Sequence, residues 1–581
     1  MLLSLGHGDR IVLVDAASPA DAQLAKAART EPDRTAITGA DAAVAPRARR
    51  GATATGEGDR FGYLFPGAAS QPPVAGAKLD ALADAMIDPA GGSAARSGLP
   101  PVMTYYGQFI DHDITANTDR ENGKTFTIVG ETITPLARDL VVSGITNLRH
   151  AKLDLDSLYG DGPLDHPLEA VMRNGAAMRV GAETNVTGQF PGMERPPLPV
   201  DTACDLPRVG PLVAAGLLDP TAVPPELLTP GQPPNQSRKA LIGDGRNDEN
   251  LVVAQLHTAM LRFHNVVVAE LAPRNLPDRE CFLEAQRFVR HVHQWLVIND
   301  YLPTVCDRAT LADVLEAGAP LYKRFHEARQ DQIPASALPM PLEFSVAGFR
   351  FGHSMIRNGY DYNRNFGAEA KILPFASLEQ LFQFTGKSPT PFLGAPTLPN
   401  NWIAEWSRFT ADLDAAHDAR PIDTRLAPTL LALPNEGGAP EDLMKHLARR
   451  NLRRGWLLNL PSAQTLIAEL AAAGLPVSRV LTRDELLSGA TGAALVDGGF
   501  DEATPLWFYV LKEAEIVQGG ERLGPLGSRI VAETLAGLVI ADPDSYWNRQ
   551  PNGTWRPSDE LRPAGVDITR LTDLLHAAGV L

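Results

Sequence analysis

The chain has 581 residues, of which 44% are hydrophobic, 21% charged and 6% aromatic, so it is long and apolar enough to bury an extensive core. Asp and Glu outnumber Lys and Arg by 69 to 53. The formal charge of −16 repels a phosphate backbone, which argues against nucleic acid as a partner. The three cysteines, Cys204, Cys281 and Cys306, have spacings that match neither a disulfide framework nor a thiolate metal site.

Residues 1–60 are rich in Ala, Arg, Asp and Gly and predict an irregular N-terminal arm. The apolar run at 1–9 is short and has no basic flank, unlike a signal peptide. No stretch approaches the ~18 consecutive apolar residues of a membrane span. These features predict a soluble protein with no membrane span, either cytoplasmic or exported without an N-terminal signal peptide.

Apolar residues recur with helical period in three windows, which predicts helices over 102–114, 249–271 and 279–301. Strand signals are scarce, and the Pro-rich connectors at 190–200 and 224–234 predict long irregular loops. The fold class is therefore predicted as mainly α, with one large helical domain over 61–540, few strands, and a C-terminal segment over 541–581 that wraps the surface.

The segment 107–113 reads GQFIDHD and falls inside the first predicted helix. A helix places Gln108 and His112 on one face one turn apart, with Asp111 on the neighbouring edge. Asp113 lies about 200° round from Asp111, so the two carboxylates meet different surroundings. Taken alone, one His between two acids is more typical of an exposed charged turn.

This segment resembles the distal-histidine motif of the animal-type haem peroxidases, the superfamily of myeloperoxidase and cyclooxygenase. Further blocks follow in the family's order: LDLDSLYG at 153–160, RNDEN at 246–250 with LHT at 256–258 and HN at 264–265, FRFGH at 349–353, and RNLRRG at 450–455. The likeness is strongest to bacterial members, which lack the disulfides of the secreted animal enzymes. The resemblance implies a large helical haem peroxidase domain that binds haem b.

The resemblance assigns roles on the distal side of that haem. His112 matches the base that takes a proton from hydrogen peroxide and returns it to the departing oxygen. Arg246 matches the fixed cation that stabilises charge on the leaving oxygen, although a surface-loop charge is the alternative for this residue. Gln108 matches the position that contacts a halide.

On the proximal side, His353 matches the ligand of the haem iron, and Asn451 matches the partner of its second ring nitrogen. Aromatic neighbours in the FRFGH segment could shield the His353 ring. Arg350 and Arg454 match arginines near the haem propionates, where a guanidinium fork suits a carboxylate. The arginine-rich run at 449–454 is also typical of a solvated helix face.

Asp111 and Glu249 match two acids that form ester links to haem methyl groups in several family members. A carboxylate at a porphyrin edge is costly to bury unpaired, so either an ester or a nearby cation would explain each of them. Asn250 stands where myeloperoxidase has a Met, which excludes a sulfonium link.

Asp113, Asp154 and Asp156 form a set of hard oxygen ligands suited to calcium, and their segment resembles the family's calcium loop. His150 stands where a Thr ligand is expected, and Lys152 can supply only its carbonyl. No metal is assigned to the other histidines of the predicted helices. Packing is the interpretation for His257 and His264, and His291 and His293 point to different sides of a predicted helix.

The resemblance implies a haem-dependent peroxidase that reduces hydrogen peroxide through a ferryl intermediate and oxidises small organic donors, with halides as a further class. A cyclooxygenase-like fatty-acid dioxygenase is the first alternative. Such enzymes carry a radical tyrosine in a Tyr-Arg-Trp-His run, and Arg350, Phe351 and Gly352 occupy that approach here. The second alternative is a binding protein without enzymatic activity, against which the intact distal and proximal histidines argue.

Overall fold

The computed structural model describes most of the chain beyond residue 58. The described residues are 59–88, 96–116, 128, 130–160, 167–189, 192–334, 336–370, 372–410, 418–433, 443, 445–550 and 553–581, with the short strands β1 (Leu3–Ser4) and β2 (Arg10–Ile11). Apart from these two strands and residues 59 and 60, the predicted arm over 1–60 lies outside the described residues.

The described part of the chain is mainly helical, as predicted. The helices of ten or more residues are α2 (Gly76–Ala85), α3 (Pro101–Ile114), α8 (Leu251–Leu271), α9 (Asp278–Leu296), α11 (Arg308–Ala317), α15 (Leu447–Leu457), α16 (Ala463–Ala472), α19 (Leu506–Gln518) and α20 (Pro525–Ala541). The shorter helices are α4 (Arg138–Gly144), α5 (Asp156–Tyr159), α6 (Pro167–Val171), α7 (Val209–Ala214), α10 (Leu302–Val305), α12 (Pro320–Glu327), α13 (Leu378–Gln383), α17 (Arg483–Leu486), α18 (Gly492–Gly498) and α21 (Leu571–Ala577).

The three helices predicted from periodicity are confirmed as α3, α8 and α9, with small shifts at their ends. Helix α8 begins at Leu251 rather than at 249, because the side chain of Asn250 accepts a hydrogen bond from the Val252 amide at 2.9 Å and caps the helix. Helix α9 ends at Leu296, and the chain continues as the π-helical segment η7 (Val297–Tyr301).

Strands are few and short. They are β3 (Asp59–Gly62), β4 (Val74–Ala75), β5 (Thr132–Ile133), β6 (Thr146–Asn147), β7 (Arg173–Asn174), β8 (Ala177–Met178), β9 (Met340–Pro341), β10 (Gly359–Tyr360) and β11 (Ala376–Ser377). The order β6–β3–β9 forms the one described sheet of three strands, with β6 antiparallel and β9 parallel to β3. This sheet ties the start of the described domain to a segment nearly 280 residues further along the chain.

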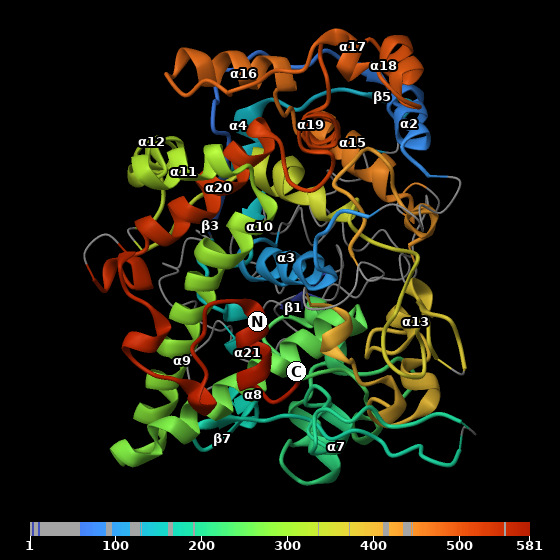
Figure 1. Cartoon of the computed structure of the whole chain (residues 1–581), viewed down its shortest axis with the longest axis vertical. Helices are drawn as coiled ribbons and strands as arrows, with labels where there is room; N and C mark the ends of the chain where they lie inside the picture. The colour runs from blue at the N-terminus through green and yellow to red at the C-terminus, as the bar shows by residue number, and fades with distance from the viewer. Residues whose placement is uncertain are drawn as a thin grey trace.

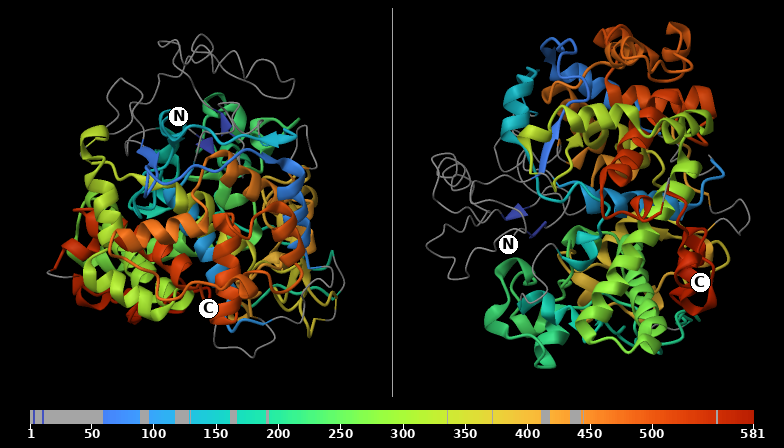
Figure 2. Two further views of the ribbon diagram at one scale, coloured as in Figure 1. Left: turned by 90° about the horizontal axis from the view of Figure 1, so that it is seen from above. Right: turned by 90° about the vertical axis from the view of Figure 1, so that its left-hand side faces the viewer.

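Helix α3 crosses the centre of the molecule (Figure 1). Helices α2, α15 and α19 lie on one side of it, and α8 and α9 lie on the other, an arrangement that the right-hand view of Figure 2 repeats. In the C-terminal segment, α21 and the 3₁₀ turn η18 (Pro563–Gly565) pack against α8, and η17 (Pro557–Asp559) packs against α9. The helix that carries the predicted distal histidine is therefore enclosed from both sides.

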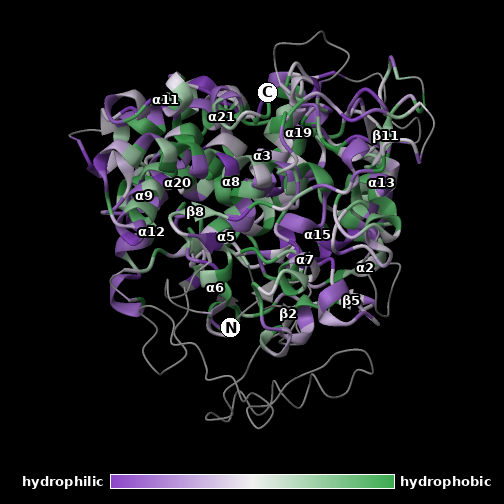
Figure 3. Ribbon diagram, turned by 90° about the horizontal axis from the view of Figure 1, so that it is seen from below, coloured by the Kyte–Doolittle hydropathy of each residue, from purple (hydrophilic) through white to green (hydrophobic). Residues whose placement is uncertain are grey.

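Helices α8 and α20 are long and apolar and supply much of the core (green in Figure 3). The segment Leu251–Arg274, which contains α8, is long and apolar enough to cross a membrane by length and composition, and 78% of its most apolar window is buried inside the protein. Such burial is what the core helix of a large domain shows.

Close packing fixes α3 against η7. A Cβ atom on Gly107 would lie 2.4 Å from the hydroxyl oxygen of Tyr301, so only glycine allows this approach. Tyr301 also packs edge-on against Tyr106 of α3 and against Phe349 of the 3₁₀ segment η10 (Gly348–His353). Helix α3 and η10 are also in direct contact, which brings the two predicted histidine segments together although they are some 240 residues apart in sequence.

Candidate active site

Helix α3 is buried on every side except one. All its residues are buried apart from Gln108 and Asp111, which lie three positions apart and therefore share a face. His112 stands in the last turn of the helix and is fully buried. The structure thus excludes the exposed-turn alternative for His112 and places it beside the single open face of a core helix.

The His112 ring is hydrogen-bonded to a second buried histidine through one amide. Its Nδ1 lies 2.8 Å from the Oδ1 of Asn247, and the Nδ2 of the same amide lies 3.1 Å from the Nδ1 of His257. All three side chains have no solvent exposure. Burial lowers the pKa of His257 to about 3, so this ring is neutral near pH 7.

Arg246 is buried rather than exposed on a surface loop, at 6% exposure. Its Nη2 donates to the main-chain carbonyl of His112 at 2.8 Å and to the Oδ2 of Asp244 at 2.7 Å. Asp244 also accepts from Arg149 at 2.9 Å. Burial alone would raise the pKa of Asp244, but the guanidinium groups of Arg149 and Arg246 hold that pKa well below its usual range.

The two predicted ester-forming acids lie near this group. The Oε1 of Glu249 is 3.9 Å from the Nε2 of His112, and its Oε2 is 3.8 Å from the Nζ of Lys387. Asp111 accepts a hydrogen bond at Oδ1 from the hydroxyl of Thr115 at 2.7 Å. Lys387 therefore supplies the nearby cation that the sequence left open as one explanation for Glu249.

The predicted proximal pair is in contact. The Nδ1 of His353 lies 3.0 Å from the Nδ2 of Asn451 on α15. A half-turn of the amide exchanges its NH₂ and C=O groups, so this side chain can either donate to Nδ1 or accept from it. The His353 ring packs edge-on against Trp507 of α19, with ring centroids 6.5 Å apart.

Arg350 is half-buried, and its Nε donates to the carbonyl of Ser345 at 2.9 Å. Arg454 is buried one turn after Asn451 on α15. The arginine-rich run is not a solvated face, because Arg450 and Arg453 are buried as well and Arg453 pairs with Asp80 of α2 at 2.6 Å.

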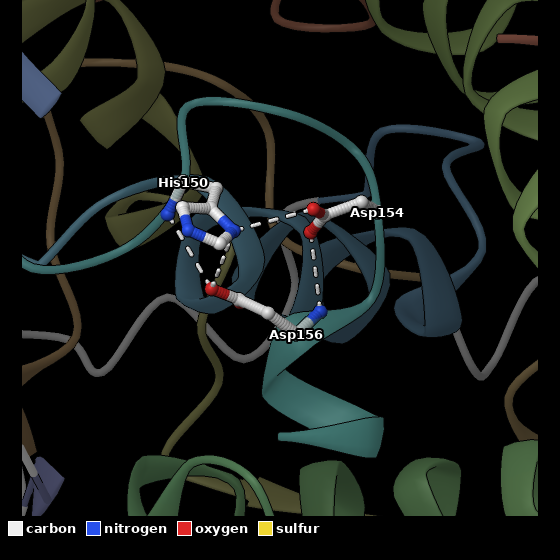
Figure 4. Close-up of side chains that lie close together, drawn as sticks. All are labelled: His150, Asp154 and Asp156. Atoms are coloured by element: carbon white, nitrogen blue, oxygen red, sulfur yellow. Dashed lines mark hydrogen bonds and ion pairs between the residues drawn. The ribbon is translucent and has the colours of Figure 1, made fainter. Parts of the chain in front are cut away.

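The predicted calcium ligands lie at the far end of α3. Asp154 and Asp156 gather with His150, and one ligand atom from each lies within 4.8 Å of the others (Figure 4). Asp113 is not in this cluster, since its Oδ2 accepts from the Leu155 amide at 3.0 Å. Its Oδ1 accepts from the amide and hydroxyl of Ser157 at 3.2 and 3.0 Å.

The three carboxylates affect one another strongly. Burial and the Asp154 charge raise the pKa of Asp113 to about 7, and burial with both neighbouring charges raises the pKa of Asp156 well above its usual range. Burial would also raise the pKa of Asp154, but His150, Arg290 and Lys152 lower it. Such a buried acidic cluster gains stability from a bound cation.

Four residues of this site received no role from the sequence: Asn247, His257, Asp244 and Lys387. Asn247 lies inside the RNDEN block and His257 inside the LHT block, but neither block says that the two side chains bond to each other. Lys387 follows Glu249 by 138 residues and belongs to no motif. Only its packing beside Glu249 reveals it.

Comparison with known proteins agrees with this geometry. A family model described as animal haem peroxidase matches residues 216–384. The chain is 28% identical over 276 residues to a peroxidase-like protein of Margaritifera margaritifera, covering 45% of this chain and 32% of that protein. It is 25% identical over 409 residues to thyroid peroxidase of Mus musculus, covering 69% and 41%.

Among solved structures, peroxidase A from Dictyostelium discoideum superposes with a TM-score of 0.56 at 16% identity, over 90% of this chain and 93% of that chain, and it shares the fold. The described fold is mainly helical and carries two histidine sites. Residues 216–384 match the animal haem peroxidase family, and the similarity to named peroxidases extends over more of the chain. The chain spans less than half the length of the two curated relatives described here.

The family implies haem, and the residues present fit that group. The imidazoles of His112 and His353 come from elements in contact, α3 and η10. A Cβ atom on Gly352, next to His353, would meet no atom within 4 Å, so there is room beside the predicted ligand. An imidazole ligand with an amide partner and buried arginines is a donor set suited to haem.

Proposed function

We propose that this protein is a haem peroxidase, an oxidoreductase that reduces hydrogen peroxide and oxidises small organic donors, with halides as a further class. The observation that carries the proposal is the direct hydrogen bond from Arg246 to the backbone of His112, which holds a buried base and a buried cation side by side. This pairing suits heterolysis of an O–O bond, because one group moves the proton and the other stabilises the departing oxygen.

When bound, haem supplies the redox centre for peroxide reduction and donor oxidation. His112 accepts the peroxide proton at Nε2 and returns it to the departing oxygen. The Arg246 guanidinium keeps its charge at every working pH and is oriented by Asp244. His353 supplies the iron ligand, and Asn451 orients its ring through Nδ1.

The proposal includes an ester bond between the haem and the carboxylate of Asp111 or Glu249. Both carboxylates stand next to His112, and Asp111 lies on the open face of α3. The Lys387 ammonium compensates part of the Glu249 charge, which makes Asp111 the stronger candidate.

Calcium is the second proposed cofactor. Asp154 and Asp156 with His150 gather ligand atoms, and Asp113 links this loop to the last turn of α3. Bound calcium would therefore fix the position of the residue next to His112. The carboxylates of Asp113, Asp154 and Asp156 support the proposal, because burial and the neighbouring negative charges raise the pKa of Asp113 and of Asp156 and a bound cation would offset this repulsion.

The fatty-acid dioxygenase alternative lacks support from the tyrosines. Tyr105 and Tyr106 are both buried in α3, and the Tyr106 hydroxyl is held by the Nδ1 of His293 at 3.0 Å. The approach to His353 through residues 350–352 contains no tyrosine.

The decisive experiment is the absorption spectrum of the purified protein before and after acid–acetone extraction. A Soret band establishes haem, and colour that stays with the protein establishes covalent attachment. Turnover of a phenolic donor with hydrogen peroxide, with negligible oxygen uptake on an unsaturated fatty acid, supports the peroxidase. Sustained fatty-acid-dependent oxygen consumption with a tyrosyl signal by electron paramagnetic resonance would replace it with the dioxygenase, and a colourless, inactive protein would leave a binding scaffold.

A further inference from the structure

The side-chain amide of Asn247 bridges the rings of His112 and His257, and this contact bears on which ring nitrogen of His112 carries the proton. The Oδ1 of Asn247 faces the Nδ1 of His112 at 2.8 Å. With the amide in this orientation its oxygen can only accept, which places the proton of a neutral His112 ring on Nδ1. A neutral imidazole has one N–H group, and its Nε2 therefore carries the lone pair that a base requires.

The same amide also contacts His257, through its NH₂ group. One amide offers one acceptor and one donor, so the Nδ1 atoms of the two histidines must be in opposite protonation states. The NH₂ group of Asn247 lies 3.1 Å from the Nδ1 of His257, which accepts there as a neutral ring. Because burial lowers the pKa of His257 to about 3, the ring stays neutral through the whole neutral range and always has one unprotonated nitrogen, which allows Nδ1 to accept from the amide.

We propose that Asn247 and His257 are positioning residues that hold His112 in the tautomer with its proton on Nδ1 and its lone pair on Nε2. The inference rests on the proposed function of His112 as the proton acceptor. Neither residue touches the peroxide in this scheme, and each acts through the imidazole of His112.

The rest of the local structure holds this bridge in place. Asn247 lies in the 3₁₀ turn η5 (Gly245–Asp248), which is capped by Asp244 and anchored by Asp248 through Arg208. His257 lies on α8 and packs edge-on against Phe109 of α3 at a centroid distance of 6.1 Å. Three elements thus fix the amide and both rings relative to one another.

The charged groups around His112 would favour the tautomer with its proton on Nε2 if the Asn247 bridge were absent. The Oε1 of Glu249 lies 3.9 Å from Nε2 and attracts a proton to that nitrogen. Arg246 faces the carbonyl of His112, and the negative charge of Asp244 is shared with two arginines. Without the acceptor at Nδ1, the Glu249 carboxylate therefore favours the opposite tautomer, in which Nε2 is protonated and cannot accept the peroxide proton.

The tautomer can be observed without any turnover. The full chain labelled with ¹⁵N-histidine is measured as purified, in the ferrous carbon monoxide form if it holds haem, because that form is diamagnetic. The ring nitrogens of His112 are assigned by the signals that disappear in His112→Gln. We expect the wild-type ring to show a protonated Nδ1 and an unprotonated Nε2 at pH 7.

Variants at His257 test whether this residue holds His112 in the proposed tautomer. His257→Leu removes the acceptor and should move the His112 proton to Nε2 in a large fraction of molecules. His257→Asn keeps an amide oxygen near the Nδ1 position and should preserve the wild-type tautomer. His291→Leu is the matched control, since it removes another buried histidine of α9, one that is hydrogen-bonded to the main-chain carbonyl of Asp544, and should leave the His112 signals unchanged.

The variants at Asn247 ask the same question from the other side, and they keep the test valid if His257→Leu fails to fold. Asn247→Leu removes both bonds and should release the tautomer, whereas Asn247→Asp keeps an acceptor for the His112 Nδ1 and should retain it. Tautomers that are the same in wild-type, His257→Leu and Asn247→Leu would overturn the inference. So would a wild-type His112 with an unprotonated Nδ1.

The kinetic consequence separates this inference from the proposed function. A wrong tautomer of a catalytic histidine lowers the rate by up to about 10⁴ in another enzyme class, so His257→Leu should slow the reaction with peroxide by about ten- to a thousandfold while His257→Asn stays close to wild-type. If wild-type protein does not react with peroxide, the peroxidase proposal fails, yet the tautomer measurement still decides the inference about Asn247 and His257.

Discussion

The Nδ1 of His353 and the Nδ2 of Asn451 lie 3.0 Å apart, although 97 residues separate them in the chain. The pair joins the 3₁₀ segment η10 to helix α15. This geometry makes His353 the candidate whose loss should have the largest effect on haem binding.

We expect His353→Ala to lose stable haem ligation, because imidazole supplies the protein ligand to the iron in the proposed site. The Soret band should weaken and shift, and added imidazole should restore part of it. His326→Ala is a suitable control, as His326 lies on α12 away from these elements. A variant with a wild-type Soret position and full turnover would show that another residue is the ligand.

His112→Ala should retain haem and lose peroxide reduction. General acid–base catalysis contributes about 10²–10⁴ to the rate, and the rate constant for reaction with peroxide should fall by at least that factor. Stopped-flow mixing with hydrogen peroxide measures it, and the unchanged Soret band of the resting variant is the control. Equal rates for variant and wild-type would remove His112 from the mechanism.

Arg246→Lys should lower peroxide reduction by about 10²–10³, the cost of losing one well-placed donor to a developing negative charge. A lysine has no planar fork and cannot bond both Asp244 and the His112 carbonyl as the guanidinium does. Lys323→Arg on α12, an exposed position, provides a control for charge exchange. Undiminished kcat/KM in Arg246→Lys would contradict the role of the fork.

Removal of calcium should lower the melting temperature and the peroxidase activity together, and added calcium should restore both. The ion would tie the loop of Asp154 and Asp156 to Asp113, next to His112, so its loss loosens the distal helix first. Metal analysis should find one calcium per chain. Asp154→Asn should mimic the chelator, whereas Asp201→Asn, at an exposed ion pair with Arg262, should not. The site is refuted if the protein contains no calcium and chelators change neither its melting temperature nor its peroxidase activity.

Acid should destabilise the protein partly through its buried histidines. Burial lowers the pKa of His264 and of His291 to about 4, while an unfolded chain titrates these groups near ~6.5. Their contribution to the free energy of unfolding is therefore complete above pH ~6.5 and is lost as the pH falls towards 4. His291→Gln should reduce the slope of the free energy of unfolding against pH in this window by up to about 1.4 kcal/mol per pH unit. Denaturant titrations between pH 4 and 7 measure it, and parallel slopes would exclude the effect.

The helical framework and the resemblance to the animal haem peroxidases can both be predicted from the order of residues along the chain. Apolar periodicity located α3, α8 and α9 because each buries a continuous apolar stripe, which is a local property of the chain. The ordered motifs singled out His112 and His353, and the structure brings the two segments that carry them into contact. What these residue types can do chemically was also fixed by the sequence.

The contacts that each of these side chains makes cannot be predicted from the chain and depend on how the helices pack. His257 looked like a packing residue, and its hydrogen bond through Asn247 to His112 depends on the contact between α8, η5 and α3. Lys387 faces Glu249 across 138 residues of chain. Hydrogen bonds and ion pairs act over about 3–4 Å, and no periodicity in the chain encodes which distant side chains arrive within that range once the core has packed.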